Sequence, residues 1–171
     1  EIPLLPRENG GERKTKNGGL VIVGSHVKKS SAQLECLLES DRPLEFLEFH
    51  VNRYFTDGDL HGETNELLNK AEEHMKKGTT VVIYTSRELV VPPTEDKDKI
   101  LHLSVAISDA LTRIVSLLSL KPRFIVAKGG ITSSDVATKG LCIRKAMVMG
   151  QIQKGIPVWM TGEKSKFPDM P

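Results

Sequence analysis

The residue types best suited to chemistry lie in KGGITSSD (128–135), directly after an apolar run. Gly129 and Gly130 have no Cβ atom and permit positive φ, so successive N–H groups there can turn toward one anion. The three hydroxyl residues that follow stand where a helix is predicted to begin, and the unpaired N–H groups of a helix start favour a phosphate. A phosphate-binding loop is therefore one interpretation. Glycine pairs after strands are common, however, and taken alone the pattern favours a tight strand-to-helix turn.

Two charged residues flank this loop, and each has a structural alternative. Lys128 can pair with phosphate as a point charge, but a lysine at a strand end is usually solvated. Asp135 stands three residues after Thr132, which is a capping-box-like spacing and favours a structural role at the helix start. The functional alternative is a contact near Mg²⁺, because a carboxylate beside phosphate requires a metal between the two.

Two further loops carry polar residues after apolar runs, GSHVKKSSAQ (24–33) and YTSRE (84–88). Ser25 can offer a hydroxyl or a backbone N–H to a ligand, or it can be a plain turn residue. Arg87 can reach a ligand at the sheet edge, but a surface ion pair with Glu88 or another acid is the simpler interpretation.

Several site classes are not supported by motif. The chain has neither GxxxxGK[ST] nor GxGxxG, so neither a P-loop nor a dinucleotide fingerprint is indicated. The five histidines show no HxH or HxxxH spacing, and no Ser/His/Asp arrangement is recognisable. Cys36 and Cys142 stand far apart in apolar patterns, which predicts core thiols in a reducing compartment rather than metal ligands. We assign no catalytic residue and no metal ligand.

Composition bounds the class of protein. With 171 residues and 39 % hydrophobic residues, one domain with its own core is expected. The formal charge of +2 and 5 % aromatic residues give no reason to expect nucleic-acid binding. No apolar run approaches a membrane span and no signal peptide is recognisable, so we expect a cytoplasmic protein without a membrane partner. Residues 1–18 are predicted to be a flexible linker and residues 19–171 a domain that is C-terminally truncated.

Strand-like and helix-like segments alternate along that domain. Strands are predicted at 19–24, 44–50, 79–86, 123–127, 146–152 and 157–160, and helices at 30–40, 62–78, 98–119 and 132–140. This alternation predicts an α/β layered domain with a mostly parallel sheet flanked by helices. The carboxyl ends of parallel strands share one edge, where ligands bind, so the three polar loops are expected to meet there.

Four blocks taken in order carry a resemblance: GSHVKKSSAQ, VVIYTSRELV, FIVAKGGITSSDVATKG and GQIQKGIPVW. From about residue 19 to 171 the chain resembles the C-terminal, nucleotide-binding domain of the four-carbon acid sugar kinase family. It looks closest to the kinase module of large plant proteins that also contain dehydrogenase and class II aldolase modules. The resemblance implies transfer of the γ-phosphate of ATP, with Mg²⁺, to a hydroxyl of a four-carbon sugar acid such as threonate or erythronate.

Matched position by position, the resemblance implies nucleotide contacts at Ser25, Gly129, Gly130, Ile131 and Thr132. It also implies that the sugar acid and the general base belong to an N-terminal domain absent from this chain, and that a further nucleotide loop follows Pro171. Because phosphoryl transfer depends on positioning both reactants, we expect an ATP-binding half-enzyme with little activity of its own.

Two other function classes stay open. One is a regulatory or association module, a possible homo-oligomer, whose nucleotide site has decayed and whose apolar edge pairs with another molecule. The other is an NAD-binding Rossmann-like domain, which is weaker because the glycine fingerprint and the ribose-binding acid are not placed as that site requires.

Overall fold

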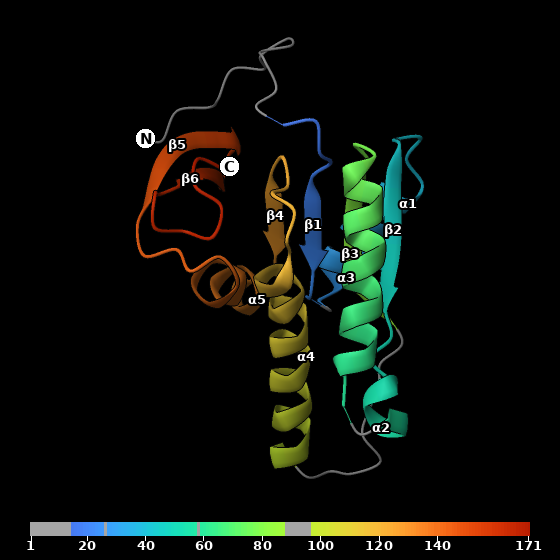
Figure 1. The fold of residues 1–171 in the computed structure, drawn as a ribbon. Helices are drawn as coiled ribbons and strands as arrows, with labels where there is room; N and C mark the ends of the chain where they lie inside the picture. The colour runs from blue at the N-terminus through green and yellow to red at the C-terminus, as the bar shows by residue number, and fades with distance from the viewer. Residues whose placement is uncertain (1–14, 26, 58, 88–96) are drawn as a thin grey trace.

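The domain is built on four parallel strands. The computed structural model describes residues 15–171 except 26, 58 and 88–96. The strands lie in the order β2-β3-β1-β4, and all their neighbouring pairs are parallel (Figure 1). Their bounds are β1 (Leu20–Val23), β2 (Leu44–Phe49), β3 (Thr80–Thr85) and β4 (Ile125–Lys128). With helices packed on this sheet, the predicted α/β layered fold is confirmed.

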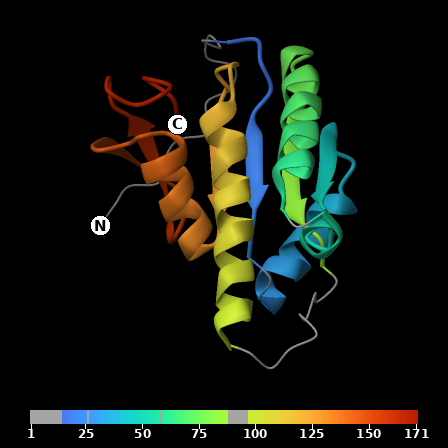
Figure 2. The same ribbon diagram turned by 60° about the horizontal axis from the view of Figure 1, so that its bottom comes forward.

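Helices cover both faces of the sheet, because the strands have buried apolar side chains on both faces. The bounds are α1 (Lys28–Leu38), α3 (His61–Lys76) and α4 (Lys97–Leu117). Leu20 and Ile22 of β1 belong to the main core with residues of α3 and α4, which lie side by side on one face (Figure 2). The alternate residue Val23 packs with Leu34 of α1 in a smaller core on the other face. This alternation follows from the two-residue period of a strand.

The chain leaves the neighbouring strands β1 and β4 toward opposite faces. After β1 it enters α1, whereas after β4 it enters α5 (Gly130–Asp135), which contacts α4. In Figure 1 the arrowheads of β1 and β4 point down, and α5 lies at the lower end of β4. In open α/β sheets, ligands bind outside the carboxyl ends of strands at such a switch point. The fold therefore singles out the loops after β1 and β4.

Three elements differ from those predicted. The short helix α2 (Arg53–Asp57) was not predicted, and the segment 132–140 is α5 followed by a π-helix, η1 (Val136–Gly140). The last two strands, β5 (Ala146–Gln153) and β6 (Ile156–Thr161), form a separate antiparallel hairpin. Only Lys154 and Gly155 connect these strands, and a parallel pair would need a crossover of a dozen or more residues.

The long helix α4 packs one face into the main core. Leu103, Leu111 and Ile114 of α4 are buried, as is Leu118 directly after it, whereas Ile100 is 41 % exposed. By length and composition alone, the stretch Ile100–Leu117 is also apolar enough to cross a membrane, which the sequence analysis did not detect. The core helix of a soluble domain has the same composition, so this stretch alone is weak evidence for a membrane span.

Segments near both ends also contact the domain. Asn17 Nδ2 donates a hydrogen bond to Lys121 O (2.8 Å), and Gly18 N donates one to Met75 O (2.8 Å). Near the other end, Phe167 and Met170 are buried in the main core. Residues 1–14 of the predicted linker lie outside the described residues.

The prediction that both cysteines are core thiols is wrong. Cys36 and Cys142 are exposed and free. Cys36 lies on the solvent side of α1, of which Ser30 and Leu34 are the buried residues. Cys142 follows η1 in a turn with φ 55°. The exposure of each cysteine side chain depends on which way its segment faces the sheet. The apolar neighbours in the sequence do not indicate that direction.

Candidate functional site

The loops after β1 and β4 touch each other through glycines. A Cβ atom on Gly24 would lie 2.3 Å from Oγ1 of Thr132, and one on Gly129 would lie 3.1 Å from Cβ of Ser25. The first separation is far below van der Waals contact, so the observed approach of the two loops requires glycine at position 24. Thr132 is buried at this contact.

Gly129 turns the chain from β4 into α5. Its backbone has φ 116° and ψ 139°, a conformation that L side chains rarely adopt. The first bond of the following helix runs from Ser133 N to Gly129 O (2.8 Å). The N–H groups of Gly130, Ile131 and Thr132 precede that bond, so the helix itself offers them no acceptor.

The outer side of this turn is open. A Cβ atom added to Gly130 would meet no described atom within 4 Å, and Ile131 is 74 % exposed. The turn therefore presents backbone N–H groups beside free space, which is the arrangement that binds an oxyanion.

The structure brings the five predicted contact residues to one place but gives them different roles. Ser25, Gly129 and Thr132 lie against one another, whereas Gly130 and Ile131 form the exposed rim of the turn. Ser25 Oγ accepts a hydrogen bond from Ser30 Oγ (3.1 Å) at the start of α1. The side chain of Thr132 packs against Gly24, so it holds the loop after β4 against the loop after β1.

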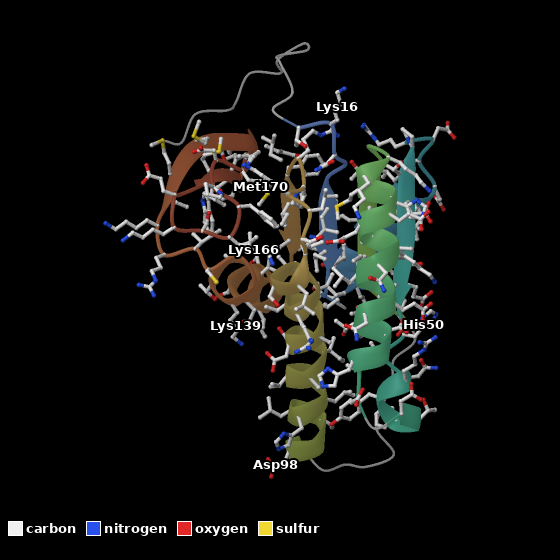
Figure 3. All side chains as sticks on the ribbon, viewed as in Figure 1. Lys16, His50, Asp98, Lys139, Lys166 and Met170 are labelled. Carbon is white, nitrogen blue, oxygen red and sulfur yellow. The ribbon has the colours of Figure 1, made fainter. Side chains whose placement is uncertain are left out.

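The predicted capping role of Asp135 is wrong. The helix begins at Gly130, two residues earlier than predicted, and its N-cap Gly129 makes no side-chain cap bond. Asp135 is the last residue of α5, and its Oδ2 accepts a hydrogen bond from Ser108 Oγ of α4 (2.8 Å). Asp135 also pairs with Lys139 (3.3 Å), raising the lysine pKa; Figure 3 shows Lys139 on the short helical segment beside α4.

Arg87 makes a contact that the sequence did not indicate. Its Nη1 donates a hydrogen bond to the carbonyl oxygen of Ser25 (2.6 Å). Its Nε and Nη2 are buried and have no hydrogen-bond partner among the described residues. Burial lowers the pKa of Arg87, and the nearby Tyr84, Glu35 and Glu48 act in the opposite direction. An arginine two residues beyond a buried strand was the available signal, whereas its predicted partner Glu88 lies outside the described residues.

With this geometry established, the comparison with known families is informative. The profile of a family described as nucleotide-binding C-terminal domain matches residues 20–171. The chain belongs to this family. No curated protein matches the chain.

At the switch point of this nucleotide-binding domain lie the backbone N–H groups after Gly129 and the side chain of Arg87. Among the described residues there is no group of three or more His, Cys, Asp or Glu side chains that could hold a metal ion. A Mg²⁺ ion usually takes one or two carboxylates and fills its remaining positions with water and substrate phosphate.

A separate pocket of the nucleotide-binding domain lies between α3 and α4. It has a volume of about 400 Å³, and its lining includes Leu60, Thr64, Ala110, Thr112 and Lys139. None of the five predicted contact residues lines it. We therefore place the candidate site at the loops and not in this pocket, since the loops alone combine the switch point, the open N–H groups and the half-buried cation.

Proposed function

We propose that this domain binds the phosphates of ATP at the loops after β1 and β4, through Ser25, Gly129, Gly130, Ile131 and Thr132. The observation that carries the proposal is the Gly129 turn. Its positive φ aims the start of α5 at open space in a chain that belongs to a nucleotide-binding family. A phosphate there would accept hydrogen bonds from N–H groups that the helix leaves without acceptors.

We further propose that the domain is the nucleotide half of a kinase that phosphorylates a four-carbon sugar acid. The resemblance of the sequence blocks supports this finer assignment. In that case a separate domain holds the sugar acid and supplies the base, and Mg²⁺ neutralises the triphosphate charge. The residues of this chain would bind and orient the phosphates. Because transfer requires both reactants to be positioned, the isolated domain would have little kinase activity.

Calorimetric titration with a non-hydrolysable ATP analogue and Mg²⁺ tests the nucleotide site. We would compare the parent chain with Gly130→Val and with the control Gly62→Val. Both glycines lie at the start of a helix, and a Cβ atom at either would meet no described atom within 4 Å. Gly130→Val should weaken binding by about tenfold or more, equivalent to at least one lost charge-assisted hydrogen bond.

The control makes the result specific. Gly62→Val should bind the analogue as the parent does, because Gly62 lies in α3, which follows β2, and two strands separate β2 from β4 in the sheet. Equal binding by the parent and Gly130→Val would contradict the placement of the site. A parent chain that binds no nucleotide would contradict the proposed function itself.

A second candidate function is association with another copy of the chain, and the hairpin of β5 and β6 favours it. Met147, Val148, Ile152 and Trp159 are each about half or more exposed. Exposed apolar patches of this kind mark interaction sites. Light scattering during size-exclusion chromatography would distinguish the candidates: a dimer that ignores nucleotide and is lost in Trp159→Ser favours association, whereas a monomer that binds nucleotide excludes it.

A further inference from the structure

The guanidinium of Arg87 is only partly used by the protein. One nitrogen, Nη1, donates to Ser25 O at 2.6 Å, which fixes the side chain against the loop after β1. The other two nitrogens are removed from solvent and have no acceptor among the described residues. Arginine stays charged in proteins, so this is a half-buried cation with two buried donors that have no acceptor among the described residues. Such a group is costly unless an anion or an acceptor completes it.

No described acid completes the group. Glu35 and Glu48 lie close enough to act on its charge, but neither forms a hydrogen bond or a salt bridge with it within the described part of the chain. The neighbouring Ser86 is already used, because its N–H donates to Phe49 O (2.9 Å) and its Oγ accepts from Val51 N (3.3 Å). No contact within the described part of the chain therefore gives Nε and Nη2 of Arg87 a structural role.

Ser25 places this cation beside the glycine turn. Its carbonyl holds Arg87, and its Cβ lies 3.1 Å from the position that a Cβ on Gly129 would occupy. The cation and the open N–H groups therefore flank one residue at the ends of the adjacent strands β3, β1 and β4. An anion lying between them would receive donors from both sides. Arginine presents its nitrogens as a planar fork that suits two oxygens of one phosphate.

We propose that Arg87 is a phosphate-binding residue of this site, donating from Nε and Nη2 to a phosphate that the N–H groups after Gly129 also bind. The proposal rests on the proposed function, since it assigns the charged partner of the same nucleotide site. It adds a residue on a third loop, after β3, to contacts that otherwise come from the loops after β1 and β4.

The test measures binding by calorimetry for two probes, the non-hydrolysable ATP analogue with Mg²⁺ and inorganic pyrophosphate. The proteins are the parent, Arg87→Gln, Arg87→Lys and the control Arg42→Gln. Arg42 is exposed and lies before β2, at the opposite edge of the sheet, so its variant removes a charge without touching the site. Circular dichroism melting of each variant establishes that it is folded at the titration temperature.

Arg87→Gln should lose about tenfold to hundredfold in affinity for both probes, the range expected for lost charge-assisted hydrogen bonds. Arg87→Lys should recover only part of the loss, because an ammonium keeps the charge but not the planar fork. Arg42→Gln should bind as the parent does. If Arg87→Gln is folded and binds both probes like the parent, the inference is overturned while the proposed nucleotide function stands.

The two probes separate the two proposals. If the parent binds pyrophosphate in an Arg87-dependent way but not the nucleotide, the proposed function fails and the assignment of Arg87 stands. If the parent binds neither probe, both fail. Acetate at matched ionic strength is the control for anion type: inhibition of pyrophosphate binding by acetate at equal concentration would overturn the assignment to phosphate in favour of a carboxylate.

Discussion

Two charged residues near the carboxyl edge of the same sheet, Glu63 and Arg87, have side-chain atoms that are closed to solvent, and they differ in how these atoms are partnered. Glu63, in the first turn of α3, has a side chain that is 2 % exposed. Its Oε1 accepts from the backbone N of His50 and lies 2.9 Å from Nδ1 of the same residue. The buried Oε2 has no hydrogen bond among the described residues but forms an ion pair with Arg53 at 2.6 Å. Figure 3 shows His50 beside the lower part of β2.

Arg87, two residues beyond β3, has one partner and two unused buried nitrogens. A buried carboxylate with hydrogen bonds on one oxygen and an ion pair on the other has a structural explanation, whereas buried nitrogens with neither kind of partner require a ligand, a water molecule or a cost in stability. Under our two proposals, the end of β2 serves folding, and the ends of β1, β3 and β4 bind phosphate. Each prediction below would break or sharpen this division.

Removing the Glu63 carboxylate should have the largest effect on stability. Glu63→Ala leaves the N–H of His50 and the guanidinium of Arg53 without their shared partner, and should lower the free energy of unfolding by about 2–3 kcal/mol. Urea unfolding measures this loss. The control is Glu66→Ala, whose side chain is 45 % exposed and pairs with Arg53 and Lys70, so a smaller loss is expected.

Binding provides the complementary measurement for the same variant. At a temperature where Glu63→Ala is folded, it should bind the ATP analogue with the affinity of the parent. A loss of binding with little loss of stability would instead show that Glu63 acts in nucleotide binding and not mainly in folding.

Gly129 should show both effects at once. Alanine there would occupy a backbone conformation with φ 116° and lie 3.1 Å from Cβ of Ser25, so Gly129→Ala should cost about 1–2 kcal/mol in urea unfolding. It should also weaken nucleotide binding. The matched variant Gly130→Ala meets no described atom and should be neutral or slightly stabilising, since alanine favours a helix over glycine. Equal destabilisation by both variants would contradict the special role of Gly129.

The fold was largely readable from the sequence because its signals are local. Runs such as LVIV and TVVIYT are bounded by turn residues, and the helices between them have long periodic faces. The failures occurred where the signal was short or non-local. The five-residue α2 is too short to show a period, and the exposure of Cys36 depends on how the short helix α1 sits on the sheet.

The candidate site was readable only in part. The glycine pair indicated a turn that can hold an anion, but which glycine takes positive φ depends on where α5 begins. The burial of Thr132 depends on Gly24, about a hundred residues earlier in the chain. The position of the Arg87 side chain depends on its hydrogen bond to Ser25 O, and this bond in turn depends on how β1 and β3 align. These properties follow from contacts between distant segments, which no single stretch of sequence contains.

Removing the unsatisfied cation should have the smallest effect on stability. Arg87→Gln loses one hydrogen bond to Ser25 O but also removes a half-buried charge with two unused donors, so the two effects should cancel to within about 0.5 kcal/mol. Urea unfolding in phosphate-free buffer measures this difference. Added pyrophosphate should then stabilise the parent more than Arg87→Gln, because a ligand raises the stability of the folded state in proportion to how tightly it binds that state. A loss as large as that of Glu63→Ala, without ligand, would instead make Arg87 structural and remove the distinction between the two ends of the sheet edge.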